Sequence, residues 1–370
     1  MKILSIFGTR PEAIKMAPVI KRLKLHPDLF TSVVCVTAQH REMLDQVLAL
    51  FDIHTDYDLN IMRHDQTLAQ LTSAVLTEVD NVIRAEKPDL VLTQGDTTTA
   101  MAGALAAFYH RVRIGHVEAG LRTWDKFQPF PEEINRKIAD AVCDLHFAPT
   151  EAARDNLLRE GVDASSVLVT GNTVIDALLD VAERDYDWES GELACIPRDR
   201  RLILVTAHRR ENFGQPLLEI CLALREIASS YPDVHLVYPV HLNPNVRSVV
   251  FDQLSDVHNI TLTDPLEYLP FAQLMKVSYL ALTDSGGLQE EAPGLGKPVL
   301  VLREVTERPE GVEAGTVKLV GANRQKIVDE TARLLDDRTE YEKMARAINP
   351  YGDGHASEKI IEKLKSLIIK

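Results

Sequence analysis

Residues 3–12, ILSIFGTRPE, join a short apolar run to a basic turn and the start of an amphipathic helix. Residues 202–211, LILVTAHRRE, repeat that order in the second half of the chain. A buried strand followed at once by a turn and a helix is typical of a parallel α/β sheet. Because this unit occurs twice, the sequence predicts two doubly wound domains in series.

Similar apolar runs continue the pattern in each half. Near-continuous apolar strands that alternate with helical segments favour sheets covered by helices on both faces. A polar segment at residues 185–201 interrupts this rhythm and is predicted to be a linker. The expected strands are residues 3–7, 32–37, 90–93, 114–117, 145–148, 202–206, 234–238, 280–283 and 298–302, and the expected helices include 12–24, 42–51, 66–85, 98–109 and 358–369.

Composition limits the class of function. The 370 residues suit two hydrophobic cores, and 41 basic against 55 acidic residues give a net charge of −14. Such an acidic surface argues against nucleic acid and anionic membranes as partners, so any bound anion needs local positive charge. No apolar run approaches the roughly 20 residues of a membrane span, and the N-terminus does not resemble a signal peptide. Four widely spaced cysteines without a Cys-x-x-Cys pair are expected to be reduced thiols of a cytoplasmic protein.

Cofactor and metal motifs are missing from the sequence. The first turn is not a Gly-x-Gly-x-x-Gly fingerprint, and neither a Walker A sequence nor a Gly-x-Ser-x-Gly elbow occurs. No His, Cys and Asp residues have the spacing of metal ligands. We therefore expect no cofactor and no catalytic metal.

Candidate anion-binding residues lie at two expected helix starts. Arg10 stands where the helix dipole and a guanidinium would both attract a phosphate, although an ordinary solvated arginine is an equal alternative. Ser285, Gly286 and Gly287 follow the expected strand 280–283, and paired glycines let backbone N–H groups approach an anion. Glu291, further along that helix, could accept two ribose hydroxyls. The alternative is a helix with Ser285 as its N-cap and acids in its first turns.

Candidate acid–base residues lie in strand-end regions and connections of the first half. Asp96 follows the strand 90–93, Glu118 follows the strand 114–117, and Glu132 lies in the connection that comes next; the mutual repulsion of these acids in one cleft would suit proton transfer. The alternative for Asp96 is an N-cap of helix 98–109. His208 follows the first strand of the second half, where it could contact phosphate or carry a proton, or could simply begin a helix.

At this point the residues resemble a known family, the bacterial non-hydrolysing UDP-N-acetylglucosamine (UDP-GlcNAc) 2-epimerases. The resemblance extends over essentially the whole chain and keeps the order of the family's motifs. The matching stretches are FGTRPEAIK at 7–15, TAQHREM at 37–43, GDTTT at 95–99, GHVEAGLRT at 115–123, PEE at 131–133, HRRE at 208–211, TDSGG at 283–287, TERPE at 306–310 and NPYGDG at 349–354.

The resemblance implies a fold like that of the GT-B glycosyltransferases, with two Rossmann-like domains facing a central cleft. It implies that the C-terminal helix returns to the first domain, which would comprise residues 1–170 and 355–370, while the second would comprise 171–354. It also implies a UDP-sugar substrate and a homodimer. The implied reaction inverts C2 of UDP-GlcNAc to give UDP-N-acetylmannosamine (UDP-ManNAc), for surface polysaccharide precursors, through loss of UDP, 2-acetamidoglucal and return of UDP.

The same resemblance assigns roles to individual residues. UDP would contact Phe271 through uracil, Glu291 through ribose, and Ser285, Gly286 and Gly287 through the phosphates. The family's essential acids correspond to Asp96, Glu118 and Glu132, with Arg136 near them. Arg10, Lys15, His208 and Arg308 also belong to the implied substrate site, with His208 among the catalytic residues.

Two departures from the family pattern are expected to matter. Many bacterial members bind a second UDP-GlcNAc as an activator, at a site that here would include Gln39, His40, Arg210 and His241. Glu42 and Asp65 stand where some of those members have Gln and Arg, and two acids would repel a diphosphate. Trp124 occupies a position where glycine is expected and could reshape the loop that leads to Glu132.

Three other functions remain open from the sequence. A GT-B glycosyltransferase would share the UDP site but has no need of three extra acids. A hydrolysing epimerase would release free N-acetylmannosamine if water reached the glucal. A UDP-sugar sensor would need the UDP site but not the acids Asp96 and Glu118.

Overall fold

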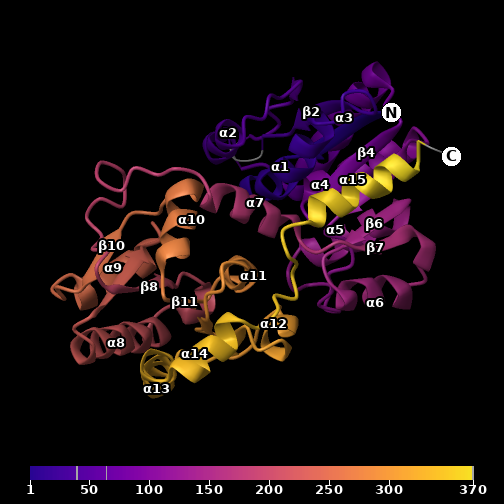
Figure 1. The fold of residues 1–370 in the computed structure, drawn as a ribbon. Coiled ribbons are helices and arrows are strands. Elements are labelled where there is room, and N and C mark those ends of the chain that lie inside the picture. The colour runs from indigo at the N-terminus through magenta and orange to yellow at the C-terminus, as the bar shows by residue number, and fades with distance from the viewer. Residues whose placement is uncertain (39–40, 64, 369–370) are drawn as a thin grey trace. The chain divides into compact units, whose positions relative to one another are not determined.

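The computed structural model describes residues 1–38, 41–63 and 65–368. The chain forms two compact units: an N-terminal unit of Met1–Ala177 with Tyr351–Lys370, and a C-terminal unit of Leu178–Pro350 (Figure 1). The chain passes from one unit to the other inside helix α7 (Thr173–Ala182). The polar segment 185–201, expected to be a linker, therefore lies within the C-terminal unit.

The N-terminal unit is built on one parallel sheet. In the described part of the chain its strand order is β3-β2-β1-β4-β5-β6-β7. Strand β1 lies between β2 and β4, as in a doubly wound sheet, and the N-terminal expectation of an α/β fold is confirmed. The strands are β1 (Lys2–Phe7), β2 (Thr31–Val36), β3 (Tyr57–Asp58), β4 (Leu90–Gln94), β5 (Arg113–Val117), β6 (Leu145–Ala148) and β7 (Val167–Val169).

Helices bury the apolar faces of this sheet. One core joins Leu4 and Ile6 of β1 to Val75 and Val79 of α3 and to the alanines of α4. Helix α15, the return of the chain, packs on α1 (Figure 1). The helices are α1 (Arg10–Lys24), α2 (Arg41–Leu50), α3 (Leu68–Glu86), α4 (Thr98–Tyr109), α5 (Glu132–Val142), α6 (Glu151–Arg159), the short η1 (Ala164–Ser166), the start of α7, and α15 (Ala356–Ser366).

The turn after β1 requires glycine because of a close approach. A Cβ on Gly8 would lie 2.1 Å from Oγ1 of Thr37 and 2.8 Å from Oγ1 of Thr99. These two hydroxyls are hydrogen-bonded to each other at 2.9 Å. The turn therefore brings the ends of β1 and β2 and the start of α4 together, which places the following residues at the carboxyl edge of the sheet.

The C-terminal unit repeats the design with its own parallel sheet. Its strand order, within the described residues, is β10-β9-β8-β11-β12-β13. A single large core joins β8, β9 and β11 to α8, α9 and α13. The strands are β8 (Arg201–Thr206), β9 (Val234–Pro239), β10 (Ile260–Thr263), β11 (Leu280–Thr283), β12 (Val299–Val301) and β13 (Val317–Leu319). The helices are the end of α7, the short η2 (Arg210–Asn212), α8 (Gln215–Ser230), α9 (Pro244–Leu254), α10 (Tyr268–Val277), α11 (Gly286–Gly294), α12 (Pro309–Glu313), α13 (Arg324–Asp336) and α14 (Arg338–Ala345).

The expected division of the chain differs from these units at both crossings. Residues 171–177 were assigned to the second domain and lie in the N-terminal unit, and so do residues 351–354. Close contacts within that unit explain the difference: the backbone N–H of Asn172 donates to the carbonyl of Tyr351 at 2.6 Å. In the described parts of the chain, no helix is both long and apolar enough to cross a bilayer.

Candidate active site

Glu118 is the most firmly held acid of the N-terminal unit. It follows β5 with a left-handed backbone (φ 68°), which is a strained conformation for a residue other than glycine. Its side chain is 9% exposed and accepts hydrogen bonds from Lys15 and Asn172 at Oε1, the latter at 2.8 Å, and from Gln94 at Oε2, at 2.5 Å. A carboxyl group surrounded by donors is held in its ionised form, so Glu118 suits the role of a proton acceptor.

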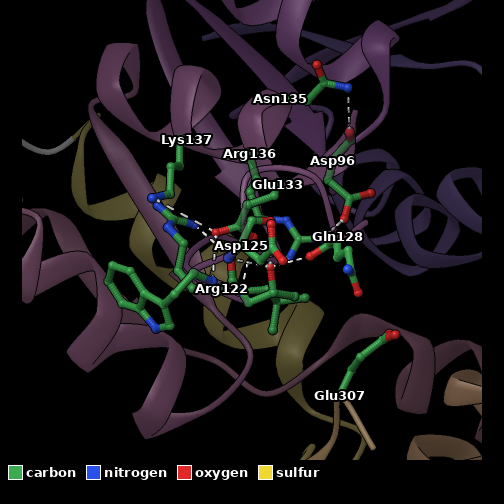
Figure 2. Close-up of polar contacts among 12 residues, drawn as sticks. Asp96, Arg122, Asp125, Gln128, Glu133, Asn135, Arg136, Lys137 and Glu307 are labelled. Carbon is green, nitrogen blue, oxygen red and sulfur yellow. Dashed lines mark hydrogen bonds and ion pairs between the residues drawn. The ribbon is translucent and has the colours of Figure 1, made fainter. Parts of the chain in front are cut away.

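Asp96 lies at the end of the neighbouring strand β4. Its carboxylate forms an ion pair with Arg136 of α5, and its carbonyl accepts a hydrogen bond from Nδ2 of Asn135 at 2.9 Å (Figure 2). Helix α4 is capped by Thr97, whose hydroxyl accepts from the backbone N–H of Ala100 at 3.2 Å. The alternative interpretation of Asp96 as this N-cap is therefore wrong, and its carboxylate is directed to Arg136 instead.

Hydrogen bonds connect the strand-end loops of β1, β4 and β5. The hydroxyl of Thr97 donates to Oε1 of Glu12 at 2.6 Å, while Oε2 of Glu12 accepts from the backbone N–H groups of Gly8 and Thr9 at 3.0 and 2.7 Å. Burial raises the pKa of Glu12 in spite of these hydrogen bonds. The loops after β4 and β5 carry Asp96 and Glu118, and Lys15 of α1 donates to Glu118, so the structure brings these three predicted residues to one edge of the sheet. Arg10, the first residue of α1, lies half-buried at that edge.

Glu132 and Glu133 begin α5, and the second of them organises the preceding loop. Glu132 is half-buried, whereas Glu133 is fully buried and accepts from the backbone N–H groups of Thr123 and Trp124 at 3.0 and 3.1 Å (Figure 2). Trp124 has a left-handed backbone (φ 64°), which explains why glycine was expected at this position. Its ring lies against the cations of Arg159 and Lys137, 4.3 and 5.1 Å from the ring centre.

A buried network of charged side chains, formed by His116, Asp140 and Arg122, connects β5 and α5 to the turn that precedes Asp96. His116 of β5 is 0% exposed, and its Nδ1 lies 2.6 Å from Oδ1 of Asp140 while its Nε2 lies 2.7 Å from the carbonyl oxygen of Gly95. Both partners are acceptors, so both ring nitrogens carry protons and the ring is an imidazolium. The other oxygen of Asp140 accepts from Arg122 at 2.7 Å. This network fixes Gly95, and with it the turn that carries Asp96.

The pKa values of the two groups move in opposite directions. Burial alone would lower the pKa of His116, but the Asp140 carboxylate outweighs it and leaves that pKa above its ordinary value of 6.5. Burial would raise the pKa of Asp140, but the charges of His116 and Arg122 hold it below its ordinary 3.8. Close by, His146 contacts the carbonyl oxygen of Asp140 through Nε2 at 2.9 Å, and burial lowers the pKa of His146.

Replacing His116 by Gln is therefore expected to destabilise the protein in a pH-dependent way. Because the pKa of His116 is raised in the folded protein, its contribution to the free energy of unfolding is fully present below pH 6.5. That contribution is lost as the pH rises through the pKa that His116 has in the folded state. Because the pKa of Asp140 is lowered, the contribution of its carboxylate to stability is present above pH 3.8 and is lost only in stronger acid. Removing one partner of a buried pair costs about 3 kcal/mol, so we expect about that loss at pH 6 and a progressively smaller one as the pH rises above 6.5. Urea unfolding of both proteins from pH 5 to 9 measures it, and a difference that stays constant with pH would contradict the imidazolium assignment.

In the C-terminal unit, His208 follows β8 as expected. Its half-exposed ring stacks on the ring of His241, with centroids 5.3 Å apart and planes 14° from parallel. Burial lowers the pKa of His208; the neighbouring Asp284 acts to raise it, while His241 and Arg209 act to lower it further. Of the four residues predicted for an activator site, His241 thus lies beside His208 and Arg210 is exposed in η2. Gln39 and His40 lie outside the described residues, as does the side chain of Glu42.

Helix α11 begins with the expected Ser-Gly-Gly sequence. Ser285 stands at the N-cap position but makes no capping hydrogen bond with its side chain, so the capping alternative is wrong in that respect. The exposed Gly287 leaves the first turn open to solvent. Glu291, about one helical turn after Gly287, is buried and accepts from the hydroxyl of Tyr268 at 3.0 Å. Tyr268 begins α10, which also carries the half-buried Phe271.

Arg308 is held against the same helix. Its guanidinium forms an ion pair with Glu290, which is 4% exposed at its side chain, and Asn349 donates to the carbonyl oxygen of Glu290 at 3.0 Å. The structure therefore groups Arg308, Glu291 and the start of α11 within one unit, with Arg308 paired to an acid of the same helix. In the described chain, no three His, Cys, Asp or Glu side chains are arranged to hold a metal ion.

Three partners of the site were not predicted from the sequence. Asn172 donates to Glu118, Asp140 pairs with His116, and Tyr268 donates to Glu291. Asn172 follows an edge strand that was not expected, and Asp140 lies in the last turn of α5. A tyrosine at a helix start gives no signal of a partner more than twenty residues away.

The N-terminal unit has hydrogen-bonded acids at the ends of its parallel strands, and the C-terminal unit has a helix that begins with two glycines. Together with the two parallel sheets, these features define a two-domain α/β enzyme of the Rossmann-like, GT-B-like class. The comparisons with known proteins agree with this class. The family model described as UDP-N-acetylglucosamine 2-epimerase matches residues 21–365. This chain belongs to the UDP-N-acetylglucosamine 2-epimerase family.

Relatives and solved structures support the assignment over the full length. The UDP-N-acetylglucosamine 2-epimerase of Escherichia coli K12 is 56% identical over 372 residues, covering 99% of each chain. The UDP-GlcNAc 2-epimerase of Neisseria meningitidis, solved bound to UDP-GlcNAc, is 52% identical with a TM-score of 0.88, covering 99% of this chain and 100% of that one. The S. aureus protein MnaA, solved with UDP, is 52% identical with a TM-score of 0.87, covering 99% and 96%.

Proposed function

We propose that this protein interconverts UDP-GlcNAc and UDP-ManNAc by inverting C2 of the sugar. The C-terminal unit would bind the UDP part, and the N-terminal unit would supply the acids. The observation that carries the proposal is Glu118, a buried carboxylate in a strained backbone conformation and fixed by three donors. The names and bound ligands of the relatives supply the substrate.

The C2 hydrogen of the substrate is not next to a carbonyl group and is not acidic. In the proposed reaction the C1–O bond breaks first and UDP leaves with the electron pair, which makes C1 electron-deficient and C2 acidic. A carboxylate removes the C2 proton, and its bonding pair forms the C1=C2 double bond of 2-acetamidoglucal. A proton is then delivered to the other face of C2, and a diphosphate oxygen of UDP adds back to C1.

The candidate residues fit this sequence of events. Glu118 is ionised and suits proton removal, while Asp96, paired with Arg136, and Glu132 are the other candidate proton carriers. Charge that develops on the departing diphosphate would be stabilised by the open first turn of α11, by Arg308 and by His208. Arg10 and Lys15 add positive charge on the N-terminal unit.

Product analysis tests the proposal and separates it from its alternatives. Incubation of the purified protein with UDP-GlcNAc, followed by anion-exchange chromatography, is expected to give a stable mixture of two UDP-sugars without free UDP. Accumulation of UDP with free N-acetylmannosamine would instead show the hydrolysing reaction. Unchanged UDP-GlcNAc that is nevertheless bound would favour a glycosyltransferase without its acceptor, or a sensor.

The elimination step has its own test. If UDP leaves and returns, ¹⁸O placed in the bridge between C1 and the β-phosphorus is expected to spread to the non-bridging β-oxygens of recovered UDP-GlcNAc. Label that stays in the bridge while epimerisation proceeds would exclude breakage of the C1–O bond. The homodimer and the role in polysaccharide precursor synthesis, both implied by the resemblance, stay predictions. Light scattering in solution would test the first of them.

A further inference from the structure

Asp284 follows β11 and is 0% exposed, so its carboxylate must be satisfied within the protein. Its Oδ2 accepts three hydrogen bonds from the turn after β8. The backbone N–H groups of His208 and Arg209 both donate at 2.8 Å, and Nδ2 of Asn212 donates at 3.0 Å. One oxygen of Asp284 therefore sets the conformation of the turn that carries His208.

The second oxygen of Asp284 is in a different situation. Among the described residues, no donor lies within hydrogen-bond distance of Oδ1, although the atom is buried. The neighbouring hydroxyls are already engaged: Thr206 with Thr283 at 2.6 Å, and Tyr238 with the carbonyl oxygen of Ala207 at 2.6 Å. The nitrogen that faces Oδ1 is Nδ1 of His208, at 3.6 Å.

We propose that Asp284 is the positioning residue of His208, with Oδ1 reserved for the Nδ1–H of that ring. A small rotation of the ring closes the 3.6 Å separation to a hydrogen bond. Nδ1 then carries the proton in the neutral ring, and Nε2 is left to face the ligand. When an anionic ligand such as a diphosphate binds, Nε2 takes up a second proton and the imidazolium lies between two anions. The identity of this ligand rests on the proposed function; the tautomer of His208 does not.

The charged surroundings of His208 make this switch depend on the ligand. Among the described residues, the charged or titratable groups that act on the ring are Asp284 at the end of β11, His241 after β9, and Arg209 of its own turn. Burial, His241 and Arg209 lower the pKa of His208, so its ring is neutral at neutral pH without ligand. Asp284 provides negative charge on the Nδ1 side of the His208 ring, and a bound diphosphate would add negative charge on the Nε2 side. Ligand binding therefore favours the protonated, positively charged form of His208.

The stacked partner ring offers an internal reference. Nδ1 of His241 accepts a hydrogen bond from the backbone N–H of Asn243 at 3.1 Å, so the neutral ring of His241 carries its proton on Nε2. The proposal therefore places opposite tautomers on two rings that stack at 5.3 Å. Long-range ¹H–¹⁵N correlation spectra distinguish the two tautomers directly.

The test uses the full chain labelled with ¹⁵N-histidine at pH 8, with the signals assigned through His208→Asn and His241→Asn. We expect the Nδ1–H tautomer for His208 in the wild type, and doubly protonated His208 when UDP is added. In Asp284→Asn, the carbonyl oxygen keeps the three donors and the amide NH₂ faces Nδ1, so His208 is expected to change to the Nε2–H tautomer. His241 stays unchanged, and Asp264→Asn, which alters an exposed carboxylate of the same unit, leaves every signal in place.

The outcomes separate this proposal from the proposed function. An Nε2–H tautomer of His208 in the wild type would overturn the proposal without any variant, even if Asp284→Asn fails to fold. In a folded variant, an unchanged tautomer would overturn it as well. If the protein epimerises UDP-GlcNAc, we expect Asp284→Asn to lower kcat about a hundredfold or more, the range that a positioned acid–base group contributes, and to shift its pH profile. If epimerisation is absent from the wild type, the tautomer measurement still decides the role of Asp284.

Discussion

Replacement of Glu118 by Gln is expected to lower kcat about a thousandfold while the protein stays folded. Glutamine keeps the shape of the side chain, and its carbonyl oxygen can accept from Lys15 and Asn172 as Oε1 does now. Its NH₂ group would face Gln94, whose own amide can turn to present oxygen instead of nitrogen. The substitution therefore removes the negative charge and the proton-accepting capacity while keeping the local packing. Steady-state kinetics with UDP-GlcNAc measures the loss.

A matched control and a binding measurement separate chemistry from folding. Glu151→Gln alters an exposed carboxylate at the start of α6, paired with Arg154, and is expected to leave kcat unchanged. Calorimetry should show that Glu118→Gln binds UDP nearly as the wild type does, because the residues proposed to contact uracil, ribose and the phosphates, namely Phe271, Glu291 and residues 285–287, belong to the C-terminal unit. A variant that retains kcat within a few-fold would show that another group removes the C2 proton.

Replacement of Gly287 by Ala is expected to change stability and UDP affinity in opposite directions. A Cβ at this position would meet only ordinary contacts, 3.5 Å from Oε2 of Glu291 and 3.8 Å from Oγ of Ser285. Because alanine restricts the unfolded chain more than glycine does, the free energy of unfolding should rise by about 0.5 kcal/mol. The added methyl group, however, occupies the exposed side of the first turn of α11, where the proposal places the diphosphate. We expect the affinity for UDP to fall about tenfold or more, which corresponds to about 1.4 kcal/mol.

Urea unfolding and calorimetry with UDP, carried out on the same preparations, measure the two effects. Their opposite signs make the result specific, since a general disturbance of the fold would lower both quantities together. An unchanged UDP affinity would show that the diphosphate does not approach the start of α11. The open turn and the missing side-chain cap of Ser285 would then have to be explained without a phosphate.

The sequence predicted the central strands of both sheets and missed their edges. β3, β7, β10 and β13, the four strands that were not expected, are the outer strands of the two sheets. Edge strands are short and partly exposed, as in β7, where all three residues are half-buried. They therefore lack the continuous apolar run by which a buried parallel strand is recognised. The same reason hid Asn172, because a residue just after a strand draws notice only where the strand itself is recognised.

The crossing between the units was hidden for a different reason. A polar segment such as 185–201 is the usual sign of a linker, yet here the boundary falls within the apolar helix α7. Nothing in a local pattern indicates that Asn172 and Tyr351, far apart in the sequence, are hydrogen-bonded neighbours. Such a division depends on tertiary contacts that only the folded chain contains.

Within the site, the positions of the residues along the chain were predicted better than their hydrogen-bond and ion-pair partners. Asp96, Glu118 and His208 were located by the rule that ligands bind beyond the carboxyl ends of parallel strands, and the structure places each of them there. Their partners Arg136, Gln94 and Asp284 lie in or close beside the motifs, but which donor meets which oxygen depends on side-chain packing. Trp124 is a case in which the sequence did indicate a structural feature. It stands where glycine was expected, and its backbone is left-handed in the structure.

The central claim is that carboxylates of this chain exchange the C2 hydrogen of a UDP-sugar. Proton NMR of the purified protein with UDP-GlcNAc in D₂O tests it most directly. The account predicts that UDP-ManNAc signals grow, that the C2 proton signals of both sugars disappear as deuterium enters, and that Glu118→Gln slows both processes together. A UDP-ManNAc that forms while keeping its original C2 hydrogen, or a complete absence of exchange in a protein that binds UDP-GlcNAc, would contradict it.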